Sequence, residues 1–184
     1  AFYKAAVREG LKPIIGCEVY VAPRGRTRFQ KVHEFDADSR HLVLLCRNEE
    51  GYRNLCYLDS CAFTEGFYIR PRIDKELLRQ HAGGLIALSA CLAGELPRLL
   101  RNGQYEDAKK EALAMRDLFG PDGYYLELQD HNLPGDPAVN QGLIRIHQET
   151  GIPLVVTNDA HYLRREDAQM QDTLMCIQMG KTVD

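Results

Sequence analysis

The sequence lacks an excess of basic residues and lacks any long apolar run. Its 184 residues include 23 Lys and Arg against 26 Asp and Glu, which gives a formal charge of −3. The global basicity of many nucleic-acid-binding domains is therefore missing, and any contact with nucleic acid would have to be local. Because no apolar stretch approaches about 18 residues, we expect no transmembrane helix and no membrane contact.

Paired cysteine motifs and glycine-rich nucleotide loops are also missing. The six cysteines form no CxxC pair, and several lie inside apolar segments. We therefore expect reduced, mostly buried thiols in a cytoplasmic protein. No Rossmann or P-loop glycine pattern is present, which gives no support to a nucleotide-binding crevice. The chain opens in a helical pattern, AFYKAAVREG, without a Met or a capping residue, so we expect a piece of a longer protein.

Short apolar segments alternate with helical patterns along the chain. Strands are predicted at 14–22, 41–46, 84–90, 124–130 and 154–159, and helices at 2–9, 48–63, 75–81, 104–119, 138–150 and 164–179, with a further short helix after residue 91. This order, in strands without clean alternation, predicts an α/β fold with a parallel sheet covered by helices. Without nucleotide motifs, a barrel-type fold is favoured, and its chemistry should lie at the carboxyl ends of the strands.

Polar side chains with metal-binding chemistry follow several of these strands. In PLVVTNDAHYL (153–163), Asp159 and His161 are two residues apart at the end of a strand and would share one face. Glu18, Cys91 and the Asp130–His131 pair occupy similar positions. Such mixed donors suit Zn²⁺, or Mn²⁺ if carboxylates dominate. A metal of this kind can lower the pKa of a bound water, which could then attack a phosphodiester.

Each of these residues also has a purely structural interpretation. Glu18 could lie on a solvated rim, Cys91 could be a small buried hydrophobe, and Asp130 with His131 could cap the following loop. Two segments combine arginine with aromatic residues, namely RGRTRFQK (24–31) and YIRPRID (68–74). Both fit phosphate contact, and both equally fit a solvated loop or a salt-bridged turn; the structural interpretation is favoured for the first, and the second stays open.

Several longer blocks carry a family resemblance: IIGCEVYVAPR, HLVLLCRNEEGYRNL, TEGFYIRPRIDKELL, GLIALSACLAGELPR, YYLELQDH and PLVVTNDAHYLRREDAQMQDTLMCIQMGKTVD. Together they resemble the PHP (polymerase and histidinol phosphatase) domain at the amino-terminal end of bacterial DNA polymerase III alpha subunits. The resemblance implies a distorted seven-stranded β/α barrel with a cluster of two or three metal ions at its mouth.

The resemblance also implies a set of site residues. The matching metal ligands are Glu18, His41, Cys91, Asp159 and His161, of which Asp159 and His161 would also be catalytic. His41 enters by resemblance alone, since it opens its predicted strand. Three further residues are candidates for contacts with the ligands or the substrate: His131, Arg72 and Arg164.

Two motifs of the family are missing from this chain. The H-x-H motif of the first strand and a D-H-G segment near the second do not occur. The chain would therefore lack about two strand–helix units and three or four ligands. We expect an incomplete, distorted (β/α)7 barrel of TIM-like form, in which residues 1–184 are a single partial PHP domain and the polymerase core follows beyond residue 184.

The resemblance places the chain in a DNA-replicating nucleotidyltransferase that uses Mg²⁺ and binds DNA and other replicase subunits. Within it, the domain would act as a metal-dependent 3′–5′ exonuclease, or as a structural platform that docks a separate proofreading exonuclease subunit. The chain alone would be inactive. The alternatives are a stand-alone PHP phosphoesterase, which blocks such as RNEEGYRNL and TEGFYIRPRID disfavour, and a non-catalytic interaction domain without metal.

Overall fold

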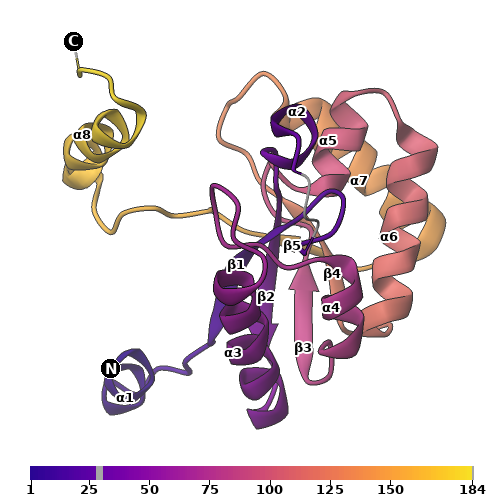
Figure 1. The fold of residues 1–184 in the computed structure, drawn as a ribbon, viewed down its shortest axis with the longest axis horizontal. Coiled ribbons are helices and arrows are strands. Elements are labelled where there is room, and N and C mark those ends of the chain that lie inside the picture. The colour runs from indigo at the N-terminus through magenta and orange to yellow at the C-terminus, as the bar shows by residue number, and fades with distance from the viewer. Residues whose placement is uncertain (28–30, 184) are drawn as a thin grey trace.

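The chain folds around one five-stranded sheet, seen in a computed structural model that describes residues 1–27 and 31–183. The strands lie in the order β1-β2-β3-β4-β5 (Figure 1). Their bounds are Gly16–Val21 (β1), Arg40–Cys46 (β2), Leu85–Leu88 (β3), Tyr124–Leu128 (β4) and Leu154–Val156 (β5). All five predicted strands are confirmed, so the chain has a mixed α/β fold. Part of the RGRTRFQK loop, residues 28–30, lies outside the described residues.

The prediction of an all-parallel sheet is wrong, because β2 runs antiparallel to both β1 and β3. The neighbouring pairs β3–β4 and β4–β5 are parallel, and β1 runs in the same direction as these three strands. The segment between β1 and β2 contains a single four-residue helix, α2 (His33–Asp36), among its described residues. A parallel crossover usually needs a full helix that packs across the sheet. The start of β2 consequently lies at the same edge as the carboxyl ends of the other four strands.

The remaining helices confirm the predicted ones, and α2 alone was not predicted. They are α1 (Phe2–Arg8), α3 (Glu49–Thr64), α4 (Lys75–Gln80), α5 (Glu95–Arg101), α6 (Tyr105–Phe119), α7 (Asp136–Thr150), the 3₁₀ helix η1 (Arg165–Asp167) and α8 (Ala168–Met179). Side-chain caps begin two of them: Asn48 accepts from the Gly51 amide and Asp74 from the Leu77 amide, each at 2.9 Å. Such caps satisfy amides that have no partner within the helix.

The hydrophobic core lies between one face of the sheet and helices α3 to α7. Alternate strand residues such as Leu44, Ala87 and Leu126 are fully buried there, and so are Leu58 of α3 and Leu143 of α7. Helices α1 and α8 stand apart from this body (Figure 1) and contain no buried residue. No helix among the described residues has the length and apolarity needed to cross a membrane.

Candidate metal centre

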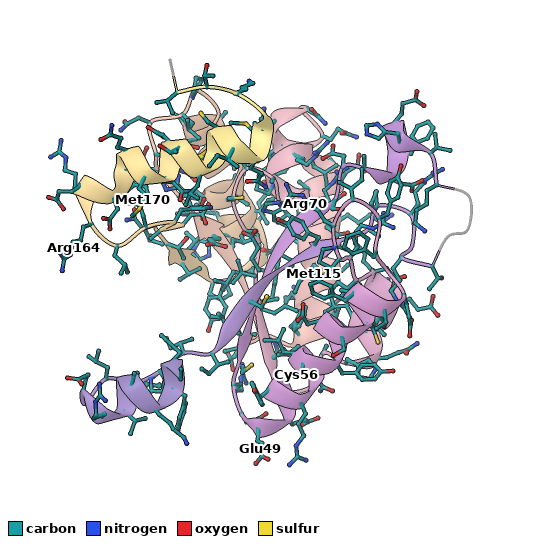
Figure 2. All side chains as sticks on the ribbon, turned by 60° about the vertical axis from the view of Figure 1, so that its left-hand side comes forward. Glu49, Cys56, Arg70, Met115, Arg164 and Met170 are labelled. Atoms are coloured by element: carbon teal, nitrogen blue, oxygen red, sulfur yellow. The ribbon has the colours of Figure 1, made fainter. Side chains whose placement is uncertain are left out.

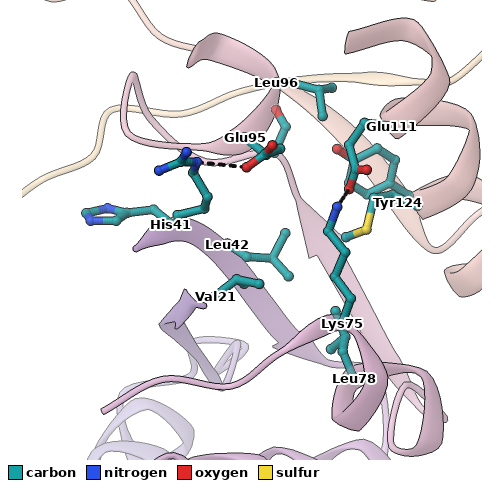
Figure 3. Close-up of a pocket in the computed structure, with 12 residues that line it drawn as sticks. Val21, His41, Leu42, Lys75, Leu78, Glu95, Leu96, Glu111 and Tyr124 are labelled. Atoms are coloured by element: carbon teal, nitrogen blue, oxygen red, sulfur yellow. Dashed lines mark hydrogen bonds and ion pairs between the residues drawn. The ribbon is translucent and has the colours of Figure 1, made fainter. Parts of the chain in front are cut away.

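Strands β1 and β2 place Glu18 and His41 on the face of the sheet opposite the core. Tyr20 pairs directly with His41, and Glu18 lies two residues earlier on β1, so all three side chains share this face. Glu18 is the third residue of β1, rather than lying beyond the strand end as predicted. The neighbouring Leu42 points into the core, where it is 6% exposed. Figure 3 shows the His41 imidazole pointing away from the pocket that Leu42 lines.

The pocket in Figure 3 adjoins this face, because His41 is also one of the residues that line it. It lies on the core side of β2, and two ion pairs cross it, Arg40 with Glu95 at 2.8 Å and Lys75 with Glu111 at 2.7 Å. These paired side chains satisfy one another's charge in a partly buried setting. The pocket therefore has a structural explanation, and the metal-binding chemistry lies on the other face.

Cys91 reaches Glu18 and His41 from the turn that follows β3. Ala90, directly before it, has a φ of 65°, a left-handed conformation that is costly for a residue with a side chain. The same turn is attached to the start of β2, because the His41 amide donates to the Ala93 carbonyl at 3.2 Å. The antiparallel direction of β2 is what brings His41 to the carboxyl end of β3. This explains how a residue that opens its strand can join a site at the strand ends.

The three side chains converge on one point. The Nδ1 atom of His41 lies 3.0 Å from Oε1 of Glu18 and 3.6 Å from Sγ of Cys91. One donor atom from each residue lies within 4.8 Å of the others. Carboxylate oxygen, imidazole nitrogen and thiol sulfur are the three protein ligand types that Zn²⁺ accepts. The donor set therefore fits a divalent metal ion.

The electrostatics of the group favour a positive charge at its centre. The pKa of the His41 imidazole is raised to about 9, first by its hydrogen bond with Cys91 and next by its hydrogen bond with Glu18. Partial burial opposes this shift. The pKa of Glu18 is lowered, first by the His41 hydrogen bond, with burial opposing and the charges of His161 and Arg70 contributing. A site that stabilises an imidazolium in this way presents electron pairs to a cation.

Asp159 and His161 lie in the loop after β5, outside the group of three. The strand ends at Val156, and Asp159 has a φ of 42°, so the rule that strand residues i and i+2 share a face does not apply here. The prediction that the two side chains share one face of a strand is therefore wrong, whereas their assignment as metal ligands stays a prediction. The Nδ1 atom of His161 lies 2.7 Å from the Asp159 carbonyl oxygen and 4.0 Å from its Oδ1. The positive charge of His161 nevertheless contributes to the lowered pKa of Glu18.

A buried carboxyl group connects the Cys91 turn to this loop. Glu127 of β4 is 5% exposed, and its Oε2 atom accepts a hydrogen bond from the Ala90 amide at 2.9 Å. Its Oε1 atom accepts from the Thr157 hydroxyl and, at 3.2 Å, from Gln129. Sequence reasoning missed Glu127, although an acidic residue within the apolar strand YYLEL is a recognisable signal, since buried acids are rare without partners.

The polar residues after β4 stabilise their own loop. Oδ1 of Asp130 accepts from the Asn132 amide at 3.2 Å, which confirms the loop-capping interpretation of Asp130. Nε2 of His131 lies 3.0 Å from the Asn158 carbonyl oxygen. His131 thus connects two loops at this edge of the sheet and does not belong to the group of three donors.

The arginines of the first basic segment form ion pairs within the fold. Arg24 pairs with Asp36, and Arg26 pairs with Asp74 at 3.0 Å and with Glu65 at 2.9 Å. The salt-bridged interpretation of this loop is confirmed for its described residues.

The two arginines of YIRPRID have opposite environments. Arg72 is 1% exposed, and its guanidinium donates to the backbone carbonyls of Gly66 and Asp36, each at 3.0 Å, so it faces the interior instead of the candidate site. Arg70 is exposed and lies over the ring of Tyr20. Sequence reasoning also missed this contact. Arg164 lies at the outer end of the segment that leads into α8 (Figure 2).

Comparison with known proteins gives a consistent result. The family model described as the PHP domain matches residues 1–131, a range that includes Glu18, His41 and Cys91 and ends before Asp159. Proteins named DNA polymerase III subunit alpha are similar over nearly the whole chain. The identity is 51% over 96% of the chain for Treponema pallidum, 46% over 97% for Borreliella burgdorferi and 43% over 100% for Thermus aquaticus. The chain spans about 15% of the length of each of these relatives.

Proposed function

The chain belongs to the PHP domain family, and we propose that it is the metal-binding PHP region of a DNA polymerase III alpha subunit. The observation that carries the metal site is the convergence of Glu18, His41 and Cys91 within 4.8 Å of one another. Zn²⁺ suits the combination of nitrogen, oxygen and sulfur, and Mn²⁺ would suit a larger set with more carboxylates. The similarity to alpha subunits over almost the full chain supports the assignment to a polymerase.

We propose that Asp159 and His161 extend the donor set from the loop after β5. His161 acts electrostatically on Glu18, and the Glu127 network connects this loop to the Cys91 turn through Thr157. The side chain of His161 is 63% exposed, against 23% for His41 and 36% for Glu18, and that of Asp159 is 30% exposed. The exposure of His161 supports its further assignment as a residue that acts on a substrate, and Asp159, two residues earlier in the same loop, is assigned with it.

The proposed reaction is 3′–5′ hydrolysis of a DNA phosphodiester. A bound divalent metal would supply Lewis-acid stabilisation of the phosphoryl oxygens. The chain's own residues would hold that metal through Glu18, His41 and Cys91. Asp159 and His161 would orient the scissile group and exchange protons with it. If metal binds without hydrolysis, the domain acts instead as the structural platform for a separate proofreading subunit.

The wider assignments belong to the same proposal. The five strands would form part of a distorted (β/α)7 barrel, and residues 1–184 would be one partial PHP domain of a longer chain. The share of about 15% that the chain covers in its relatives supports this. The whole protein would polymerise DNA with Mg²⁺ and would bind other replicase subunits. The relatives' common name does not favour a stand-alone phosphoesterase.

Metal analysis of the full-length subunit tests the proposal. We expect bound Zn or Mn in the wild-type protein by plasma mass spectrometry, and at least a tenfold weaker metal affinity in Glu18→Gln, His41→Asn and Asp159→Ala, because each removes a ligand. Asp130→Ala is the matched control, since Asp130 caps a neighbouring loop. Unchanged metal content in Glu18→Gln and His41→Asn would overturn the metal site, and an unchanged content in Asp159→Ala alone would remove Asp159 from it.

Hydrolysis is tested separately with a 5′-labelled single-stranded oligonucleotide. The polymerase preparation should shorten it from the 3′ end, and chelation of the metal should stop the reaction. A metal-loaded wild-type protein that leaves the oligonucleotide intact would refute the exonuclease assignment and leave the platform role.

A further inference from the structure

Arg70 lies in a strained turn between α3 and α4. Tyr68 and Arg70 form an isolated bridge, and Ile69 between them has a φ of 64°. A β-branched residue in the left-handed region is unusual and persists only where its surroundings enforce it. The turn therefore holds Arg70 in a defined place at some conformational cost.

Tyr20 connects Arg70 to the candidate metal centre. The guanidinium carbon of Arg70 lies 4.9 Å from the centre of the Tyr20 ring, and Nη1 donates to the Tyr20 hydroxyl. The Tyr20 ring in turn packs edge-on against the His41 imidazole, with the ring centres 5.0 Å apart. Glu18 lies two residues before Tyr20 on the same face of β1. The Tyr20 ring thus lies between Arg70 and the donor group, and the positive charge of Arg70 contributes to the lowered pKa of Glu18.

Arg70 also has no carboxylate of its own among the described residues. Arg24, Arg26 and Arg40 each form an ion pair with an acidic side chain. The side chain of Arg70 contacts the neutral ring and hydroxyl of Tyr20, and it is exposed. Its positive charge is therefore available to a ligand that approaches the metal centre from solvent.

We propose that Arg70, together with the Tyr20 hydroxyl, binds a phosphate group of the substrate beside Glu18, His41 and Cys91. The guanidinium presents a planar pair of N–H donors that matches two phosphate oxygens. The Tyr20 hydroxyl accepts from Arg70 and can donate its own proton to a third oxygen. The ligand is thus a phosphomonoester or phosphodiester, such as a nucleotide. The assignment of this ligand as substrate rests on the proposed function.

The test measures binding of inorganic phosphate and of thymidine 5′-monophosphate to the full-length, metal-loaded subunit by calorimetry. Loss of a charge-assisted, two-donor contact should weaken binding by about 10- to 100-fold in Arg70→Gln. The phosphate affinity of Arg70→Lys should lie between those of the wild type and Arg70→Gln, because lysine keeps the charge and loses the planar pair of N–H donors. Tyr20→Phe should show a smaller loss than Arg70→Gln.

Arg53→Gln is the matched control. Arg53 is an exposed arginine on α3 that pairs with Glu49, so the variant makes the same charge change away from the site. Its phosphate affinity should equal that of the wild type. Identical isotherms for the wild type and Arg70→Gln would overturn the proposal, and so would a wild-type protein that does not bind phosphate.

Metal content measured on the same samples separates this inference from the proposed function. We expect Arg70→Gln to hold as much metal as the wild type, because Arg70 donates no ligand atom. If Arg70→Gln binds phosphate more weakly than the wild type and no sample contains metal, the result would support the Arg70 site and refute the metal site. Bound metal with unchanged phosphate binding would support the metal site and refute the Arg70 site.

Discussion

Replacing Glu127 by Ala should loosen the turn that carries Cys91. The carboxyl group accepts from the Ala90 amide at 2.9 Å through one oxygen, and from Thr157 and Gln129 through the other. Alanine has no acceptor in its side chain, so the buried Ala90 amide would lose its hydrogen-bond partner. A buried donor without an acceptor costs about 1–3 kcal/mol.

Amide hydrogen exchange measures this loss locally in the full-length protein. If the Ala90 amide exchanges through local opening, a loss of about 1–3 kcal/mol corresponds to roughly 5- to 150-fold faster exchange. The same turn presents Cys91 to His41 and Glu18, so we also expect about 10- to 100-fold weaker metal binding, as is typical when a group that orients a metal ligand is altered. A chelator competition gives this second quantity.

Glu111→Ala is the matched control for this experiment. Glu111 of α6 is a partly buried acid whose ion-pair partner is Lys75 of α4, at 2.7 Å. This variant should leave both the Ala90 exchange rate and the metal affinity unchanged. Equal Ala90 exchange in the wild type and Glu127→Ala would refute the reasoning, because it would mean that the carboxyl group does not hold the turn.

Two further changes test the fold. Hydrogen bonds from Lys109 and Arg145 lower the pKa of Glu149 to about 2, from 4.5, so its contribution to stability is complete above pH 4.5 and is lost as the pH falls to 2. Glu149→Gln should therefore reduce the pH dependence of urea unfolding between pH 5 and 3, and equal pH dependences would contradict this. In Gly51→Ala, the new Cβ would lie 1.9 Å from the Gly84 carbonyl oxygen, so we expect a loss of about 1–3 kcal/mol in the same unfolding assay; a wild-type midpoint would contradict the close packing of α3 on this turn.

The strands and most helices could be predicted from the sequence because their signals are local. Apolar runs, the Asn48 and Asp74 caps and the break after residue 119 depend on neighbouring residues only. Glu18 and Cys91 were also proposed from their local position near strand ends, although Glu18 lies within β1, and His41 came from a family resemblance. These residue types and their spacing were sufficient to suggest a metal site and a ligand chemistry for it.

Only the tertiary structure decided how those elements are joined. The apolar pattern of a strand does not indicate its direction, so the sequence did not predict that β2 is antiparallel to β3. That direction is the physical reason why His41 lies beside Cys91. Arg72 and Arg70 are two residues apart in one loop, yet Arg72 is buried and Arg70 is exposed. The long-range contacts of Arg72 with Asp36 and of Arg70 with Tyr20 account for the difference. The sequence by itself determined the elements and the donor types, whereas packing between distant segments determined which donors meet, because a convergent site depends on contacts that no local pattern encodes.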